Sequence, residues 1–259
     1  MTGILHDKIV FGPINSRRLG KSLGINLLPQ DIKICTMNCI YCECGWAKTD
    51  EIIYSKLLPA SEIVPVIAAR LQQMHNDHVL IDSITYSGNG EPCIHLQFGE
   101  ITREIIRLRN QYFPQTVITC LSNSTQLHRK DVVDALKAID HRMMKLDAGT
   151  QAMFEQINKP FKHLKLDDVC DNLRQFNGDL SIQTLLLKGT LDNGELIDNT
   201  TSEEITAWLQ RLRYIKPQKV ILYSIDRETP AKKLIKIDKE TLFNIANRVE
   251  KIGIKAEVY

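Results

Sequence analysis

The chain has 259 residues, a length that a single barrel of alternating strands and helices commonly reaches. Its 33 Lys and Arg nearly balance its 31 Asp and Glu, and a net charge of +2 excludes a global field that would by itself demand a nucleic-acid partner. The first residues lack a basic region followed by an apolar stretch, and no run approaches the ~20 apolar residues of a membrane span. We therefore expect a cytoplasmic protein with no membrane partner and one domain over residues 1–259.

Taken in chain order, the sequence alternates strand-like and helix-like segments. Residues 1–19 form an extension before the first expected strand at 23–27, and Ser61 is expected to cap the first long helix. Later strands are predicted where short apolar or β-branched runs occur, as in buried parallel sheets. These runs are residues 83–86, 117–121, 142–146, 182–187 and 220–223.

Helices are predicted between the strands, where apolar residues recur three and four positions apart. This spacing covers residues 98–112, 205–215 and 242–252. The second of these helices follows two overlapping capping boxes, Thr200 to Glu203 and Thr201 to Glu204.

About six strand–helix units result, joined right-handed into a curled parallel sheet. The predicted class is therefore α/β, with a core at about 20–230 and a C-terminal helix and strand at 238–259. Six units are too few for a closed eight-stranded barrel. In such folds a site forms at the carboxyl ends of the strands.

Three cysteines, Cys35, Cys39 and Cys42, lie within eight residues and can bind one inorganic centre. Three protein ligands on a four-iron cluster would leave one iron free for a substrate or cofactor. An alternative is a non-catalytic metal-binding module with Cys44 as fourth ligand, although only one residue separates Cys44 from Cys42. The seven Cys of the chain fit reduced, metal-bound thiols better than a disulfide framework.

The C-x3-C-x2-C spacing resembles the cluster loop of the radical S-adenosylmethionine (SAM) enzymes. Tyr41 matches the aromatic residue that precedes the third Cys in that family and lies near the adenine of SAM. Residues 11–45 resemble a subgroup of small iron-sulfur oxidoreductases related to the wyosine-base-forming tRNA enzymes. The resemblance implies a partial (β/α)6 TIM-like barrel with outer helices, a 4Fe-4S cluster held by Cys35, Cys39 and Cys42, and SAM as second cofactor.

A glycine-rich turn follows the second predicted strand. Gly88 and Gly90 would let the backbone approach a ligand closely, and Glu91 offers an acceptor for an ammonium group. The segment resembles the Gly-Gly-Glu-Pro element that holds the amino group of SAM, with Asn89 as a departure from its commonest form. The alternative is a purely structural turn.

Polar residues also follow the third, fourth and fifth predicted strands. By resemblance Ser122 or Asn123 would touch SAM, while Ser124 or Thr125 would cap the helix that begins near Arg129.

Lys145 and Asp147 are two apart on a strand and share a face, where burial is costly unless they pair or bind ligand charges. The resemblance favours contact with the methionyl part of SAM, against a structural ion pair. Gln183 is a weaker candidate of the same type.

The sequence thus predicts an enzyme that cleaves SAM reductively to a 5′-deoxyadenosyl radical and abstracts hydrogen from a substrate that it does not identify. An electron donor such as flavodoxin or ferredoxin is implied as partner. A basic group at the expected top rim could bind a phosphate-bearing substrate or RNA. This group is Arg227, Lys232, Lys233 and Lys236.

Two alternative activities come from the same resemblance. Glycyl-radical-activating enzymes share the Cys spacing and would imply a protein substrate. Formation of the tricyclic wyosine base on tRNA is expected to be absent, because its enzymes use a second cluster and the remaining cysteines here are scattered. They are Cys44, Cys93, Cys120 and Cys170.

Overall fold

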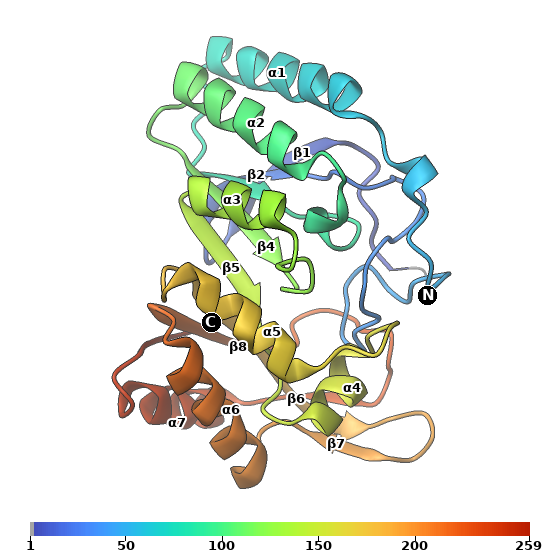
Figure 1. The fold of residues 1–259 in the computed structure, drawn as a ribbon, viewed down its shortest axis with the longest axis vertical. Coiled ribbons are helices and arrows are strands. Elements are labelled where there is room, and N and C mark those ends of the chain that lie inside the picture. Colours follow the sequence, from blue (N-terminus) through green and yellow to red (C-terminus); the bar gives the residue numbers. More distant parts are fainter. Residues whose placement is uncertain (1–2) are drawn as a thin grey trace.

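A curved, mostly parallel sheet forms the centre of the computed structural model, which describes residues 3–259 (Figure 1). Six parallel strands lie side by side in chain order. They are β2 (Gly20–Ile25), β3 (Ser83–Tyr86), β4 (Val117–Ser122), β5 (His141–Lys145), β6 (Ser181–Thr190) and β8 (Lys219–Ser224). The predicted α/β class and partial (β/α)6 barrel are confirmed.

Four further strands extend this sheet. β10 (Lys255–Val258) adds a parallel strand beside β8, and β1 (Val10–Ser16) pairs antiparallel with β2 at the opposite edge. β7 (Leu196–Asp198) and β9 (Leu234–Lys236) both pair antiparallel with the long carboxyl end of β6. The sequence patterns did not predict β1, β7 or β9.

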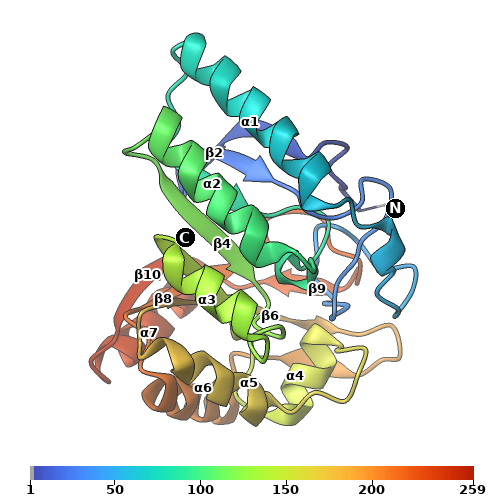
Figure 2. The ribbon, with the colours of Figure 1, turned by 45° about the horizontal axis from the view of Figure 1, so that its top comes forward.

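The helices follow one another along the outer side of the sheet (Figure 2). They are α1 (Ala60–Asn76), α2 (Phe98–Tyr112), α3 (Lys130–Ala138), α4 (Gln151–Asn158), α5 (Leu166–Leu173), α6 (Ser202–Ile215) and α7 (Lys239–Glu250), with short 3-10 turns η1 (Tyr54–Lys56), η2 (Pro92–Ile94) and η3 (Arg174–Phe176). None of the helices in the described part of the chain is long and apolar enough to cross a membrane.

The two faces of each central strand differ in chemistry because side chains alternate along a strand. On the outer face, Tyr86 lies 5.2 Å from the Phe98 ring and donates a hydrogen bond to Thr102. The concave face carries small hydroxyl residues instead. Ser22, Ser83, Thr85 and Thr119 form one buried hydrogen-bonded group across β2, β3 and β4.

Two helix starts differ from the prediction, because residues distant in sequence take part in both of them. Helix α1 begins at Ala60, so Ser61 lies within its first turn and does not cap it. The Ala60 amide donates instead to the Gln97 side chain, at 2.9 Å.

The start of α6 matches the second capping box only in part. Thr201 Oγ1 accepts from the Glu204 amide at 3.3 Å, as predicted. The Glu204 carboxylate, however, does not return to Thr201. It accepts hydrogen bonds from the Gly149 amide and from Thr150, whose amide lies at 3.1 Å and whose hydroxyl lies at 2.8 Å. This buried carboxylate therefore ties α6 to the segment that follows β5.

Candidate functional site

The three clustered cysteines lie on a loop between β2 and α1 that is held from two sides. On one side, the amides of Asn38 and Ile40 donate to the carbonyls of Asn158 and Ile157 at the end of α4, at 3.1 and 3.0 Å. On the other side, the Ile34 amide donates to the Asn89 carbonyl at 2.9 Å. The cysteine loop thus lies between α4 and the glycine-rich turn after β3.

Two side-chain amides point at the cysteine sulfurs. Asn123 Nδ2 lies 3.4 Å from Cys35 Sγ, and Asn158 Nδ2 lies 3.4 Å from Cys39 Sγ. Burial raises the pKa of Cys35 to about 12 and also raises the pKa of Cys39 above its ordinary value. A bound metal deprotonates such thiols outright, and N–H donors around the sulfurs tune a cluster.

Lys33 is a buried cation beside the three cysteines. Its Nζ donates to the Gly45 carbonyl at 2.9 Å, and the residue is only 4% exposed. Burial alone would lower the pKa of Lys33, but the neighbouring thiols of Cys42, Cys35 and Cys39 raise it, so the net shift is upward. Nothing in the sequence singles out Lys33, because a lysine ordinarily lies in solvent.

Cys44 links the cysteine loop to the glycine-rich turn. Its Sγ donates to the Gly88 carbonyl at 3.2 Å. A hydrogen bond from Cys44, reinforced by the Lys33 ammonium, also lowers the pKa of Cys42 to about 5. One S–H proton serves only one of these two acceptors at a time. In both arrangements Cys44 acts as a donor next to the site.

The donor set fits a multi-iron cluster. Within residues 3–259, no three His, Cys, Asp or Glu side chains converge closely enough to hold a single metal ion. Thiolates around one zinc, at Zn–S of about 2.3 Å, would lie about 4 Å apart. In a four-iron cluster each thiolate binds its own iron. Three Cys, two amide donors and a buried Lys are chemically suited to such an anionic group.

The glycine-rich turn requires both of its glycines. Gly88 and Gly90 have φ values of 130° and 136°, and a Cβ at Gly90 would lie 1.8 Å from the Ile34 carbonyl oxygen. The backbone of the turn therefore packs directly against the cysteine loop.

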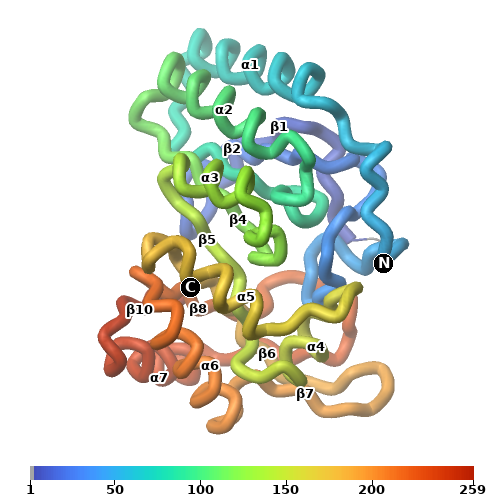
Figure 3. The backbone as a smooth tube through the Cα atoms, in the orientation of Figure 1, coloured from blue at the N-terminus to red at the C-terminus, as the bar shows by residue number. Residues whose placement is uncertain are grey.

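Asn89 explains the departure of this turn from the commonest form of the motif. Its side chain accepts from the His6 amide at 2.8 Å and donates to the carbonyls of His6 and Pro29, at 2.9 and 2.8 Å. The Ile4 amide donates to the Glu43 carbonyl at 2.9 Å. Residues 4–6 thus contact both the cysteine loop and the turn, and Figure 3 traces this amino-terminal part of the described chain in blue.

Glu91 is buried and accepts three hydrogen bonds from the protein. The donors are the Cys93 amide at 3.0 Å, the Ser122 hydroxyl at 2.9 Å and the Asn123 amide at 2.6 Å. Burial raises the pKa of Glu91, and these hydrogen bonds offset part of the increase. The carboxylate therefore fastens the turn to the end of β4, and its predicted contact with an ammonium group stays a prediction.

Glu91→Ala is expected to weaken SAM binding by about 10- to 100-fold, as for loss of a charged hydrogen bond worth about 1.5 to 3 kcal/mol, and to leave iron content unchanged. The reason is that the acceptor expected for the ammonium group of SAM is lost, together with the attachment of the turn to β4, while the cysteine ligands remain. Equilibrium dialysis of SAM and iron analysis measure the two quantities. Glu100→Ala, on the exposed side of α2, is the matched control. An unaltered SAM affinity in Glu91→Ala would show that the turn is wrongly placed.

The polar residues after β4 make contacts between loops and do not cap a helix. Asn123 Nδ2 donates to Thr36 Oγ1 at 2.9 Å, and Thr125 Oγ1 shares a hydrogen bond of 2.7 Å with the same hydroxyl. Ser124 Oγ donates to the Lys145 carbonyl at 3.2 Å. Helix α3 starts after Arg129 with no side-chain cap, so the expected cap by Ser124 or Thr125 is wrong.

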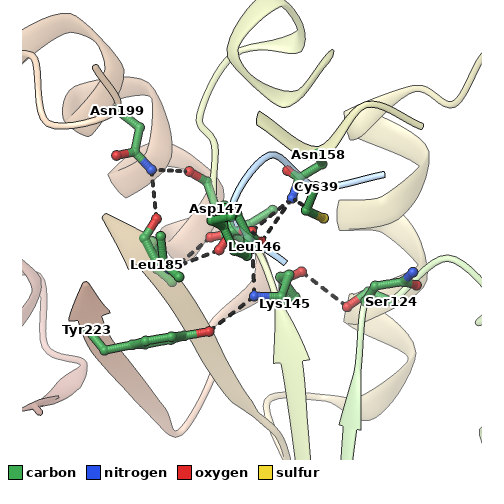
Figure 4. Close-up of polar contacts among 12 residues, drawn as sticks. Cys39, Ser124, Lys145, Leu146, Asp147, Asn158, Leu185, Asn199 and Tyr223 are labelled. Carbon is green, nitrogen blue, oxygen red and sulfur yellow. Dashed lines mark hydrogen bonds and ion pairs between the residues drawn. The ribbon is translucent and has the colours of Figure 1, made fainter. Parts of the chain in front are cut away.

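Lys145 and Asp147 share the concave face, as predicted. Figure 4 shows Lys145 between Tyr223 and Asp147. Lys145 Nζ lies 3.6 Å from Asp147 Oδ2 and donates to the Tyr223 hydroxyl at 3.1 Å. Burial alone would lower the pKa of Lys145, but Asp147 raises it above its ordinary value, followed by Tyr223 and Cys39. Lys145 therefore stays cationic.

Asp147 is the centre of this network, with no exposed side-chain surface. It accepts from the Tyr41 hydroxyl, from Asn158 Nδ2 at 2.9 Å and from the Leu185 amide at 2.9 Å. Since Asn158 also contacts Cys39, a hydrogen-bonded path connects the cysteine loop to the ends of β5 and β6. Asn158 and Tyr223 were missed in the sequence, because neither has a local signal.

Gln183 lies next to Lys145 in the pairing of β5 with β6. Its Nε2 is 3.0 Å from the Met143 sulfur, and the residue is buried. The structure therefore brings the predicted residues at the ends of β3, β4 and β5 to the cysteine loop, and Gln183 lies beside Lys145 in the sheet.

Comparison with known proteins gives consistent family matches. The model of the Radical SAM superfamily matches residues 30–199. A UPF0026 protein of Methanocaldococcus jannaschii is 31% identical over 232 residues, which cover 88% of this chain and 66% of that protein. A Brachyspira hyodysenteriae protein named GTPase Obg is 30% identical over 92% of this chain, which spans only 33% of that protein.

Solved structures of radical SAM proteins share the fold. A radical SAM methyltransferase from Sphaerobacter thermophilus superposes with a TM-score of 0.64 at 16% identity, covering 92% of this chain and 65% of that one. Archaeal TYW1 superposes with a TM-score of 0.56 at 12% identity, covering 89% of this chain and 71% of that one. At these identities the likeness concerns the fold alone.

Proposed function

Because the chain belongs to the Radical SAM superfamily, we propose that it is an enzyme that holds a 4Fe-4S cluster on Cys35, Cys39 and Cys42 and cleaves SAM reductively. The observation that supports this most is the packing of the cysteine loop against the glycine-rich turn and the end of β4. When bound, the reduced cluster supplies one electron to the sulfonium of SAM.

The chain's own residues would hold SAM beside that cluster. The backbone at Gly88 and Gly90 offers a close approach, and Ser122 and Asn123 lie at the adjoining strand end. Tyr41 presents its ring 5.0 Å from Lys145 Nζ, so a cation and an aromatic face are available together. The buried network around Asp147 would fix both groups and exclude water.

The remaining cysteines support a single cluster. Cys93 and Cys120 are buried with their sulfurs 4.0 Å apart, and Cys170 contacts Arg211 between α5 and α6. Neither place adjoins Cys44, which contacts Gly88. We therefore propose that the chain does not form the wyosine base through a second cluster.

An electron donor such as flavodoxin or ferredoxin would reduce the cluster. The proposal of a phosphate-bearing or RNA substrate gains little from the basic rim, because much of its charge is paired. Arg227 pairs with Glu43 and Lys236 pairs with Asp226, each at 2.8 Å.

The test is anaerobic reconstitution followed by incubation with SAM and dithionite. We expect slow formation of 5′-deoxyadenosine even without substrate, measured by liquid chromatography. Protein without iron is the control. A reconstituted protein that retains iron but yields no 5′-deoxyadenosine would instead favour the non-catalytic metal-binding module.

A further inference from the structure

Arg18 has a buried nitrogen without a partner. It lies in the turn between β1 and β2, and its guanidinium carbon is 4.6 Å from the centroid of the Tyr223 ring. Its Nη1 is buried and makes no hydrogen bond within residues 3–259. A buried N–H without an acceptor costs free energy, so an unsatisfied donor in a native structure points to a missing partner.

The charge of Arg18 is also uncompensated in the described part of the chain, where no ion pair includes it. The adjacent Arg17 differs, because it is exposed and pairs with Asp226 at 2.7 Å. On the same Tyr223 ring, Lys145 Nζ lies 5.7 Å from the centroid. Lys145 has Asp147 as its counter-charge, so the surplus positive charge belongs to Arg18.

Arg18 contacts a strand that is not adjacent to β1 or β2 in the sheet. β2 and β8 are separated in the sheet by β3 to β6, yet Arg18 of the β1–β2 turn reaches Tyr223 of β8. Its side chain therefore crosses the open side of the partial barrel. Through Tyr223 and Lys145 it adjoins the network of Tyr41 and Asp147, beside the site assigned to SAM.

We propose that Arg18 binds an oxyanion of the substrate, a carboxylate or a phosphate, at the open side of the barrel. This rests on the proposed function, which puts SAM at the strand ends and leaves the concave side for a second molecule. The planar guanidinium offers two parallel N–H donors, which match the oxygens of either group. The Tyr223 ring holds the guanidinium plane from one side.

The test compares the parent chain with Arg18→Gln and, as matched control, Arg17→Gln. Sodium phosphate and sodium acetate serve as probes, each titrated at constant ionic strength maintained with sodium chloride. Calorimetric titration and the thermal unfolding midpoint are measured on the cluster-free chain and on the reconstituted chain with SAM. We expect at least one probe to bind the parent and Arg17→Gln, and to bind Arg18→Gln at least about 10-fold more weakly, as for a charged hydrogen bond.

The two probes distinguish the source of the oxyanion, since phosphate alone would indicate a phosphate group and acetate alone a carboxylate. If Arg18→Gln does not fold, Arg18→Lys replaces it, because it keeps the charge without the two parallel N–H donors. Arg18→Lys is expected to bind the probe less tightly than the parent. Equal binding by the parent and the Arg18 variant, or binding of neither probe to the parent, would overturn the proposal. An Arg18 variant with lowered SAM affinity would do so too, because it would assign Arg18 to SAM itself. Titrations on the cluster-free chain keep these outcomes separate from a failure to cleave SAM.

Discussion

Simultaneous Ala substitution of Cys35, Cys39 and Cys42 is expected to remove the bound iron completely, from about four irons per chain, the content of one 4Fe-4S cluster. These thiolates are the only clustered sulfur donors on the loop apart from Cys44, whose S–H contacts Gly88. Iron and sulfide analysis after anaerobic reconstitution, with the visible absorption spectrum, measures the loss.

Two single substitutions serve as controls for the cysteine experiment. Cys44→Ala is expected to retain the iron and SAM cleavage, because only a weak S–H donor is lost. Cys170→Ala, at a buried position beside Arg211, tests for non-specific effects of removing a thiol. Loss of the cluster in Cys44→Ala would refute the three-ligand arrangement. About eight irons per chain would indicate a second cluster and reopen the wyosine reaction.

Asp147→Ala is expected to lower the free energy of unfolding by about 3 to 5 kcal/mol, the usual cost of removing one partner of a buried ion pair. The change leaves Lys145 without its counter-charge and takes the acceptor from the Leu185 amide, Asn158 and Tyr41. Urea unfolding of the cluster-free protein under reducing conditions, followed by circular dichroism, measures it.

Two further variants show where this loss comes from. Asp226→Ala removes a half-exposed carboxylate that pairs with Arg17 and Lys236, and is expected to cost about 0 to 1 kcal/mol. The double variant Lys145→Met with Asp147→Leu should recover part of the lost stability, because no unpaired charge stays buried. A loss below about 1 kcal/mol in Asp147→Ala would mean that water reaches Lys145 and that the pair is not effectively buried.

The central strands could be predicted because each is a short apolar run whose position does not depend on distant residues. The predicted run 83–86 coincides with β3, and 117–121 lies within β4. Strands β7 and β9 could not be predicted from the sequence, because each has only three residues and is stabilised by pairing with β6. The cap of α1 could not be predicted for the same reason, as the Gln97 side chain at its start shows, whereas α2 begins at the predicted Phe98.

The residues of the candidate site also fall into two groups, those that a local pattern predicts and those that it does not. The cysteine spacing and the glycine-rich turn are local patterns, and local chemistry suffices to suggest them. Lys33, Asn158 and Arg18 acquire their surroundings only when the loop, α4 and the β1–β2 turn come together. Lys, Asn and Arg side chains are mostly exposed in folded proteins, so their residue types alone favour an exposed position. A buried polar residue of this kind is recognisable only from the three-dimensional contacts.

The segment that binds Asn89 has a consequence for the order of folding. His6 and Asn89 are 83 positions apart, so during synthesis the first residues leave the ribosome long before their partner exists. Contacts of such long sequence separation form late, because the chain entropy of closing the loop must be overcome first. Residues 35–44 are therefore synthesised before residues 4–6 can make their contacts with Asn89, which need β3 and its turn. For the cluster proposed on Cys35, Cys39 and Cys42, this order would leave the cysteine loop open to metal delivery until the turn after β3 has been made.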